Sequence, residues 1–183
     1  MIKAGIIGST GYAGQEIVRI LLGHKDVEIV WYGSRSFIDK KYYEVFGNMF
    51  QIVDATCLGE NMDELAEKVD VIFTATPQGL CSSLVNEDIL SKVKIIDLSA
   101  DFRIKDVATY EKWYKIEHKS PEFIDEAGVS SGSGVWIGGN QSEGYSVCKT
   151  SGKSGLLYNL LHSFLISACK READRSEYDH CRC

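Results

Sequence analysis

The sequence has no apolar run close to the roughly 20 residues that a helix needs to span a bilayer. It also lacks an excess of positive charge, since its formal net charge at pH 7 is −6. Nucleic acids and anionic membranes bind basic faces, so the negative net charge argues against both as partners. A local basic pocket for a small anion remains compatible with it. The N-terminus, MIKAGIIG, indicates a first β-strand and not a signal peptide. We therefore expect a cytoplasmic protein with no membrane or nucleic-acid partner.

Paired cysteine motifs are absent as well. No two of the six cysteines form a C-x-x-C pair, and no histidine spacing completes a zinc site. Cys181 and Cys183 are too close in sequence for an ordinary disulfide. We therefore expect free thiols in a reducing compartment and no metal site. The six residues are Cys57, Cys81, Cys148, Cys169, Cys181 and Cys183.

What the sequence does contain, up to about residue 127, is a clean alternation of apolar strands and helical segments. The expected strands are Ile2–Ile7, Val27–Tyr32, Asp70–Thr76 and Val93–Ser99, and the expected helices are Tyr12–Leu22, Asp63–Lys68 and Gly79–Leu90. Such alternation implies a parallel sheet with helices on both faces. The predicted fold class is therefore α/β, a Rossmann-type doubly wound parallel sheet.

The character of the chain changes after Ala127. The segment GVSSGSGVWIGG is rich in glycine and serine and has no sustained period, and residues 156–168 form an apolar stretch that suits one helix. The charged end is typical of disorder. We predict a nucleotide-binding domain over residues 1–127 and an atypical, irregular or partly helical tail over residues 128–183.

The most informative local pattern is the segment GIIGSTGYAG, a strand followed by G-x-x-G-x-x-G and a helix, which is the context of a dinucleotide-binding loop. We expect Gly8 to turn the chain out of the strand, Gly11 to let a pyrophosphate approach, and Gly14 to let the helix pack closely. The helix N-terminus then offers N–H groups to the phosphates. The alternative is a merely tight strand-to-helix turn. The candidate cofactor-binding residues here are Gly8, Ser9, Thr10, Gly11, Tyr12, Ala13 and Gly14, with Ser9 and Thr10 adding hydroxyl donors.

The second expected strand ends in YGSRS, where an NAD-binding protein usually has an acidic residue for the ribose hydroxyls. This chain has Ser34, Arg35 and Ser36 instead. A guanidinium flanked by hydroxyls suits a 2′-phosphate, which favours NADP as the cofactor. The alternative is an ordinary exposed arginine in a loop.

Two further segments follow expected strands at the edge where ligands bind in such sheets. In ATPQG we assign Thr76, Pro77 and Gly79 to the cofactor, and in DLSADFR we expect Ser99 to reach its nicotinamide end. We expect Asp101 and Arg103 either to serve this site or simply to pair with each other. We interpret Tyr110, Trp113 and Tyr114 as core or interface aromatics and His118 as solvated.

Together, the segments GIIGSTGYAGQE, SRS, ATPQG and especially IIDLSADFRIKD closely resemble N-acetyl-gamma-glutamyl-phosphate reductase, a family similar in plan to aspartate-semialdehyde dehydrogenase. The resemblance covers residues 1 to about 127. It implies NADPH-dependent reduction of an acyl phosphate to a semialdehyde in arginine biosynthesis. In that family a cysteine thiolate attacks the acyl phosphate, phosphate leaves, hydride reduces the thioester, and a histidine of the second domain assists.

The chain departs from that family beyond residue 127. It has neither the family's N-P-G-C-Y motif, which holds the nucleophile, nor its large substrate domain. Cys148 lies near the expected place but lacks the preceding Asn-Pro-Gly, so we assign no catalytic residue, and Gln78 replaces a histidine that the family often has. The resemblance therefore implies a chain that binds NADP and is inactive alone.

A loss of reading frame near codon 127 explains this departure. For suitable codons, a one-base shift converts GKSGLLYNLL (residues 152–161) into ENPGCYTTC, WIGGNQSE (136–143) into GLEEIKA and ADRSEYDHCRC (173–183) into LIDPNTIIVDA. All three resemble family segments, and all three use the same shift. We predict that the nucleotide sequence encodes N-P-G-C-Y in the next frame around codon 156. A next frame without that motif would show that the tail is a real, unrelated segment.

Other interpretations stay open at this point. The chain could be a stand-alone NADP-binding module that senses nucleotide, or a subunit that needs a complementing chain to supply the cysteine and the substrate pocket. It could also form a homo-oligomer. The nearest alternative enzyme is an aspartate-semialdehyde-dehydrogenase-like protein, against which DLSADFR argues.

Overall fold

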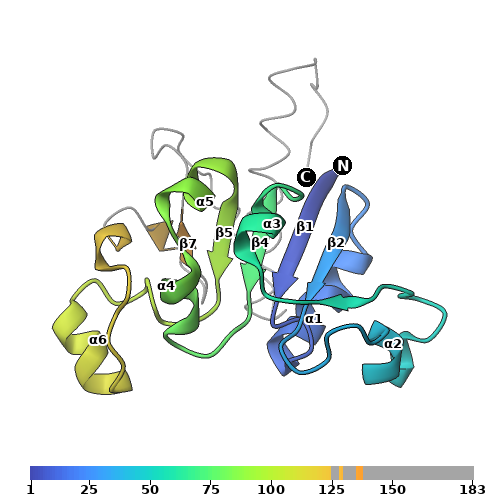
Figure 1. Cartoon of the computed structure of the whole chain (residues 1–183), viewed down its shortest axis with the longest axis horizontal. Helices are drawn as coiled ribbons and strands as arrows, with labels where there is room; N and C mark the ends of the chain where they lie inside the picture. The colour runs from blue at the N-terminus through green and yellow to red at the C-terminus, as the bar shows by residue number, and fades with distance from the viewer. Residues whose placement is uncertain (125–127, 130–134, 138–183) are drawn as a thin grey trace, which may run out of the picture.

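The computed structural model describes residues 1–124, 128–129 and 135–137, and within them one sheet organises the chain (Figure 1). Five parallel strands lie in the order β3-β2-β1-β4-β5, and two short antiparallel strands, β7 and then β6, continue the sheet beyond β5. The strands are β1 (Ile2–Ile7), β2 (Val27–Gly33), β3 (Cys57–Leu58), β4 (Val71–Thr74), β5 (Lys94–Asp97), β6 (Gly128–Val129) and β7 (Val135–Ile137). The predicted doubly wound α/β fold is confirmed.

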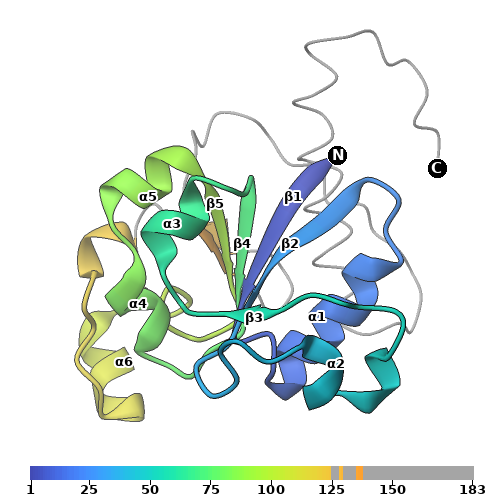
Figure 2. The same ribbon diagram turned by 45° about the vertical axis from the view of Figure 1, so that its right-hand side comes forward.

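Helices cover both faces of the sheet (Figure 2). One face carries α1 (Tyr12–Leu22), α2 (Tyr42–Val45) and the 3-10 turn Gly47–Met49, and the other carries α3 (Met62–Ala66), α4 (Leu80–Leu84), α5 (Glu87–Lys92), α6 (Val107–Tyr114) and the 3-10 turn Pro121–Phe123. Two buried apolar clusters correspond to these two layers. All four residues of β4 are buried, as expected for a central parallel strand covered on both sides.

Helix α1 matches its prediction at both ends. Ile17, Val18 and Leu21 recur at helical spacing and are buried against the sheet. The helix ends where the N–H of Gly23 bonds back to the carbonyl oxygens of Ile20 and Leu21. This packing fixes the direction of the helix, and its N-terminus lies directly after the glycine loop.

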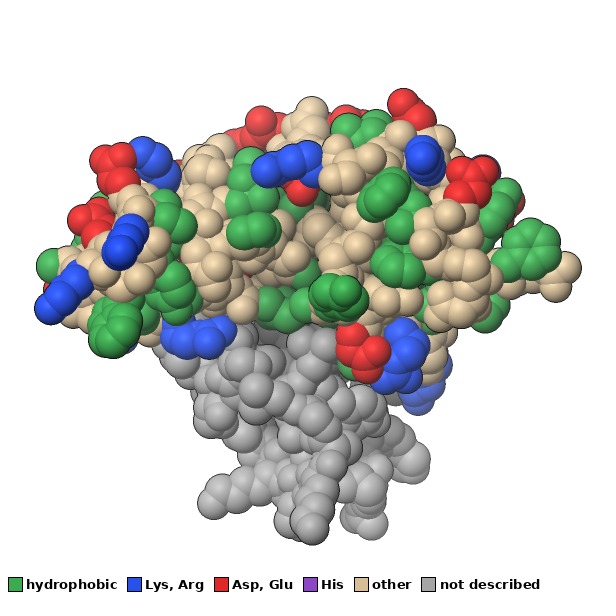
Figure 3. All heavy atoms as spheres, turned by 90° about the horizontal axis from the view of Figure 1, so that it is seen from below, with side chains coloured by type: hydrophobic (Ala, Val, Ile, Leu, Met, Phe, Trp, Pro, Cys, Tyr) green, Lys and Arg blue, Asp and Glu red, His purple; other side chains and the backbone are tan. Residues whose placement is uncertain are grey.

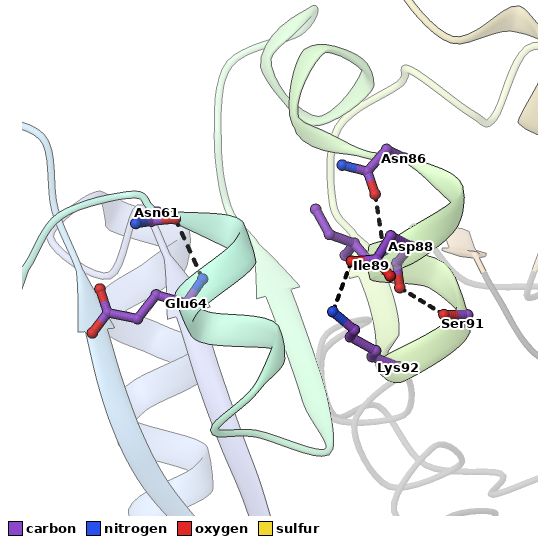
Figure 4. Close-up of polar contacts among 7 residues, drawn as sticks. All are labelled: Asn61, Glu64, Asn86, Asp88, Ile89, Ser91 and Lys92. Atoms are coloured by element: carbon purple, nitrogen blue, oxygen red, sulfur yellow. Dashed lines mark hydrogen bonds and ion pairs between the residues drawn. The ribbon is translucent and has the colours of Figure 1, made fainter.

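The single helix expected over Gly79–Leu90 is wrong, because the chain forms two shorter helices there. Helix α4 ends before Val85, which is extended, and Asn86 begins α5 by accepting a hydrogen bond at Oδ1 from the Ile89 N–H at 2.9 Å. Asn61 begins α3 in the same way, through the Glu64 N–H at 3.3 Å (Figure 4). Asparagine is a preferred N-cap because its side-chain oxygen satisfies an N–H that the helix leaves unpaired.

No sequence pattern indicated β3, α2, α6, β6 or β7. Strands β6 and β7 belong to the glycine-rich segment after residue 127, where the lack of alternation gave no strand signal, and β7 pairs with β5. The predictions for residues 138–183, including the helix over 156–168, the disordered end and the shifted frame, lie outside the described residues. No helix in the described part of the chain has the length and apolar character needed to cross a membrane.

Candidate functional site

The strand order places a binding edge between β1 and β4. From β1 the chain adds β2 and β3 on one side of the sheet, and then β4 and β5 on the other side of β1. The carboxyl ends of β1 and β4 therefore flank the point at which the strand order reverses. In open α/β sheets, ligands bind in the crevice at such a point. Figure 3 views the molecule from this edge and shows mostly uncharged surface in the middle, with charged side chains toward the rim.

The glycine loop lies at this edge, and its three glycines have different environments. Gly8 has a φ of +78°, and a Cβ added there would lie 2.4 Å from the Ala75 carbonyl oxygen. A Cβ at Gly14 would lie 2.1 Å from the Gly8 carbonyl oxygen, which is backbone and cannot move aside. At Gly11 the nearest atom would be 3.4 Å away and the residue is exposed. Gly8 and Gly14 therefore shape the loop, whereas Gly11 keeps its outer surface open.

The N-terminus of α1 presents backbone N–H groups at that open surface. Gly11 is its N-cap and provides no side-chain cap, and no acidic residue occupies the first turn. Tyr12, with 98% of its surface exposed, and Ala13 are the first residues of the helix. Since the first N–H groups of a helix have no partner within it, this end carries donors and a partial positive charge suited to an anion.

Four hydroxyl groups near the loop bind other groups of the protein. Ser9 is fully buried, and its N–H and Oγ both donate to the Gly33 carbonyl oxygen, at 2.8 and 3.0 Å. The Tyr42 hydroxyl donates to the Ser9 carbonyl oxygen at 3.0 Å, and burial raises the pKa of Tyr42, which keeps this donor protonated. Thr10 Oγ1 lies 2.8 Å from Ser34 Oγ, which also accepts the N–H of Phe37. The hydroxyls of Ser9 and Ser34 thus fix the loop to the end of β2, and their assignment to the cofactor stays a prediction.

Arg35 follows the end of β2 and forms an ion pair that no sequence motif indicated. Its Nε and Nη2 both donate to Glu60 Oε2, at 3.1 and 2.9 Å. The Arg35 side chain is 67% exposed, while that of Glu60 is only 16% exposed. Ser36 is exposed beside them. The pairing could not be read from the sequence because it depends on β3, a two-residue strand with no periodic signal.

A buried carboxylate organises the end of β5. Asp97 accepts hydrogen bonds from Thr74 Oγ1 at 2.8 Å, from the Ser99 N–H at 3.0 Å and from Ser99 Oγ at 2.5 Å. Burial raises the pKa of Asp97, and the hydrogen bonds from Ser99 and Thr74 oppose that rise. Ser99 is itself buried, and its hydroxyl positions Asp97. From the sequence we expected this hydroxyl to reach the nicotinamide.

Asp101 holds the segment after β4 in place. It accepts hydrogen bonds from the Gly79 N–H at 2.8 Å, the Tyr110 hydroxyl at 2.7 Å and the Ser82 N–H at 3.0 Å. Of the two alternatives for Asp101 and Arg103, direct pairing is wrong among the described contacts, and Arg103 Nη2 donates to the carbonyl oxygen of Ser99 at 3.1 Å. The turn there also depends on glycine, because Gly79 has a φ of +86°, a conformation that few other residues adopt.

The expectation for His118 is also wrong. The residue is buried, its Nε2 lies 2.7 Å from the Asp101 carbonyl oxygen, and its ring contacts Phe102 and Tyr110 edge-on. It is part of the core that supports the DLSADFR segment.

Of the three aromatic residues assigned to a core or interface, Tyr110 is fully buried and Trp113 is 76% exposed.

The segment between β4 and α4 presents the remaining candidate residues. Thr76 Oγ1 is buried and has no hydrogen-bond partner among the described residues, while Pro77 is exposed at the same edge. A buried hydroxyl without a partner is costly unless a ligand or water satisfies it. Within the described residues, no group of three or more histidine, cysteine or acidic side chains is arranged to hold a metal ion.

Known proteins resemble this chain over its first part. The chain is 72% identical to N-acetyl-gamma-glutamyl-phosphate reductase of Lachnospira eligens and 74% identical to that of Lachnoclostridium phytofermentans, in each case over 127 residues, which are 69% of this chain and 36% and 37% of those proteins. It therefore spans about a third of the length of these relatives. A solved aspartate semialdehyde dehydrogenase with NADP from Candida albicans is similar over 58% of this chain and 32% of that one, with 19% identity and a TM-score of 0.49.

The resemblance inferred from the motifs is confirmed by these relatives. The model of one protein family, the semialdehyde dehydrogenase NAD-binding domain, matches residues 3–126. That match includes the glycine loop, Arg35, the segment after β4 and the DLSADFR segment. The chain therefore belongs to the family of semialdehyde dehydrogenase NAD-binding domains.

Proposed function

We propose that this chain binds NADP(H) and represents the nucleotide-binding part of an N-acetyl-gamma-glutamyl-phosphate reductase, an enzyme that reduces an acyl phosphate to a semialdehyde. The observation that carries the proposal is the uncapped N-terminus of α1, which lies directly after the glycine loop at the reversal of strand order. The family match to an NAD-binding domain and the reductase relatives support it.

The pyrophosphate is assigned to the glycine loop. The N–H groups of Tyr12 and Ala13 would donate to its oxygens, because helix α1 and its N-cap leave them without partners. Gly11 lets the phosphates reach these groups, because it has no side chain at an exposed position. Thr10 Oγ1, partly exposed and already in contact with Ser34, adds a hydroxyl at the rim of the loop.

The two ends of the dinucleotide are assigned to different strands. The adenosine ribose with its 2′-phosphate would lie at the end of β2, against Arg35 and the exposed Ser36. The nicotinamide end would lie after β4, against Thr76, Pro77 and Gly79, where the partnerless Thr76 hydroxyl can donate or accept. The nicotinamide supplies the hydride when the cofactor is bound. Ser99 acts there only indirectly, by holding Asp97.

Neither of the two cysteines among the described residues suits the role of the reductase nucleophile. Cys57 and Cys81 are both buried, and burial raises the pKa of each thiol. A nucleophilic cysteine needs a lowered pKa and access to substrate. We therefore propose that the described domain contributes cofactor binding, and that reduction depends on groups outside it.

The assignment of Arg35 is tested by measuring the dissociation constants of NADPH and NADH for the full chain and for Arg35→Gln. We expect NADPH to bind more tightly than NADH, and the variant to lose about tenfold in NADPH affinity while NADH affinity stays within about twofold, because only NADPH carries the 2′-phosphate. Lys40→Gln is the matched control, since Lys40 is an exposed cation of the same loop. An equal loss for both nucleotides, or no loss, would contradict the assignment.

A further inference from the structure

The pair formed by Arg35 and Glu60 brings opposite charges to the proposed ribose site. Arg35 lies just beyond the end of β2, and Glu60 lies just beyond the end of the neighbouring strand β3. Because β2 and β3 are parallel, their carboxyl ends meet at the same edge of the sheet. Both donors of the pair, Nε and Nη2, bind one oxygen of the carboxylate, Oε2.

This geometry leaves binding capacity on both partners. A guanidinium has five N–H donors, so about three, on Nη1 and Nη2, stay without a partner among the described residues. The second carboxylate oxygen of Glu60 likewise has no hydrogen bond there. Arg35 is mostly exposed and able to reorient, whereas Glu60 is mostly sheltered and remains at the edge. The site therefore offers an exposed cation beside a sheltered anion.

The two charges favour different nucleotides. A phosphate group of about two negative charges is attracted by Arg35 but repelled by Glu60, over distances at which partly sheltered charges still interact by more than the thermal energy. An unphosphorylated ribose presents hydroxyl groups, and a carboxylate near the end of the second strand is well suited to accept their hydrogen bonds. Glu60 therefore opposes the phosphorylated nucleotide and favours the unphosphorylated one.

We propose that Glu60 sets the nucleotide selectivity of this site, as the sheltered carboxylate that limits affinity for a 2′-phosphate and preserves affinity for the plain ribose. The inference rests on the proposed nucleotide-binding function and adds a residue that the motifs did not indicate. Glu60 acts partly through Arg35, whose guanidinium it holds, and is a positioning residue in that respect. Selectivity is then a balance between two charges and does not follow from the arginine alone.

The test compares Glu60→Gln with the unaltered full chain. Glutamine keeps a side-chain oxygen that accepts from Arg35 but removes the charge, so it separates positioning from repulsion. We expect affinity for NADPH to rise about fivefold and affinity for NADH to stay equal or fall, so that the ratio of the two affinities rises about fivefold or more. The same ratio measured with 2′,5′-ADP and 5′-ADP as probes removes any contribution of the nicotinamide.

Glu64→Gln is the matched control, because Glu64 is an exposed acid of the next helix, paired with Lys68. It should leave the ratio unchanged. The rise in Glu60→Gln should shrink at high salt, since salt screens the repulsion. A ratio that is unchanged or lowered in Glu60→Gln overturns this inference while nucleotide binding itself stands. Absence of binding by the unaltered chain overturns the proposed function and this inference together.

Discussion

Replacing Gly14 with alanine is expected to lower the free energy of unfolding by about 3 kcal/mol and to abolish NADPH binding. The new methyl group would lie 2.1 Å from the Gly8 carbonyl oxygen and 2.7 Å from the Ser9 Cα, both backbone atoms. Relief of these contacts requires α1 to shift away from the loop, against the burial of Ile17 and Leu21. For a chain of this size, thermal unfolding should shift down by about 10 °C.

Two other glycines provide the controls. Gly23→Ala meets its nearest atom at 3.5 Å and has a φ of −83°, so its unfolding temperature should change little. Gly11→Ala should also stay folded, since its φ is −84° and the space around it is open, yet it should weaken NADPH binding because its methyl group occupies the path of the pyrophosphate. Full NADPH affinity in Gly11→Ala would show that the nucleotide does not approach this loop.

Replacing Asp101 with alanine is the second large expected effect, a loss of about 4 kcal/mol in the free energy of unfolding. The change removes the acceptor from two backbone N–H groups and from the buried hydroxyl of Tyr110. Each donor left without a partner costs about 1–3 kcal/mol. The N–H groups of Gly79 and Ser82 are the ones that lose their acceptor, so the segment after β4 should become mobile.

Asp88→Ala is the matched control for this prediction, because Asp88 is an exposed aspartate on α5 whose ion pair with Lys92 is open to water. Such a pair is worth about 0.5 kcal/mol. Denaturant unfolding of both variants measures the difference, and amide hydrogen exchange of residues 78–82 should rise in Asp101→Ala alone. Equal unfolding free energies for the two variants would show that Asp101 does not organise this segment.

The sequence predicted the parts of the fold that depend on local periodicity. Strand β1 and helix α1 have the predicted bounds, because an apolar run followed by residues at helical spacing and a glycine stop is a strong local signal. The break between α4 and α5 was missed although Asn86 is a recognisable cap, since the apolar spacing on both sides suggested one helix. Strand β3, with two residues, has no period to detect.

The candidate site was predicted at the level of the backbone and less well at the level of side chains. The motifs identified which loops converge, because parallel strands bring their carboxyl ends to one edge. They did not indicate that the Ser9 hydroxyl donates to Gly33 or that the Tyr42 hydroxyl donates to Ser9. They also did not indicate that Glu60 forms an ion pair with Arg35. These contacts join residues 24 to 33 positions apart in the chain, so only the folded structure brings them together.

An amide NMR titration of the full chain with NADPH tests the central claim most directly, namely that the glycine loop and the N-terminus of α1 bind a dinucleotide phosphate. We expect saturable shifts at one-to-one stoichiometry, largest for the amides of Gly11, Tyr12 and Ala13, with a second group at residues 34–36. Saturation with the largest shifts elsewhere, or no saturable shift in the glycine loop, would contradict it.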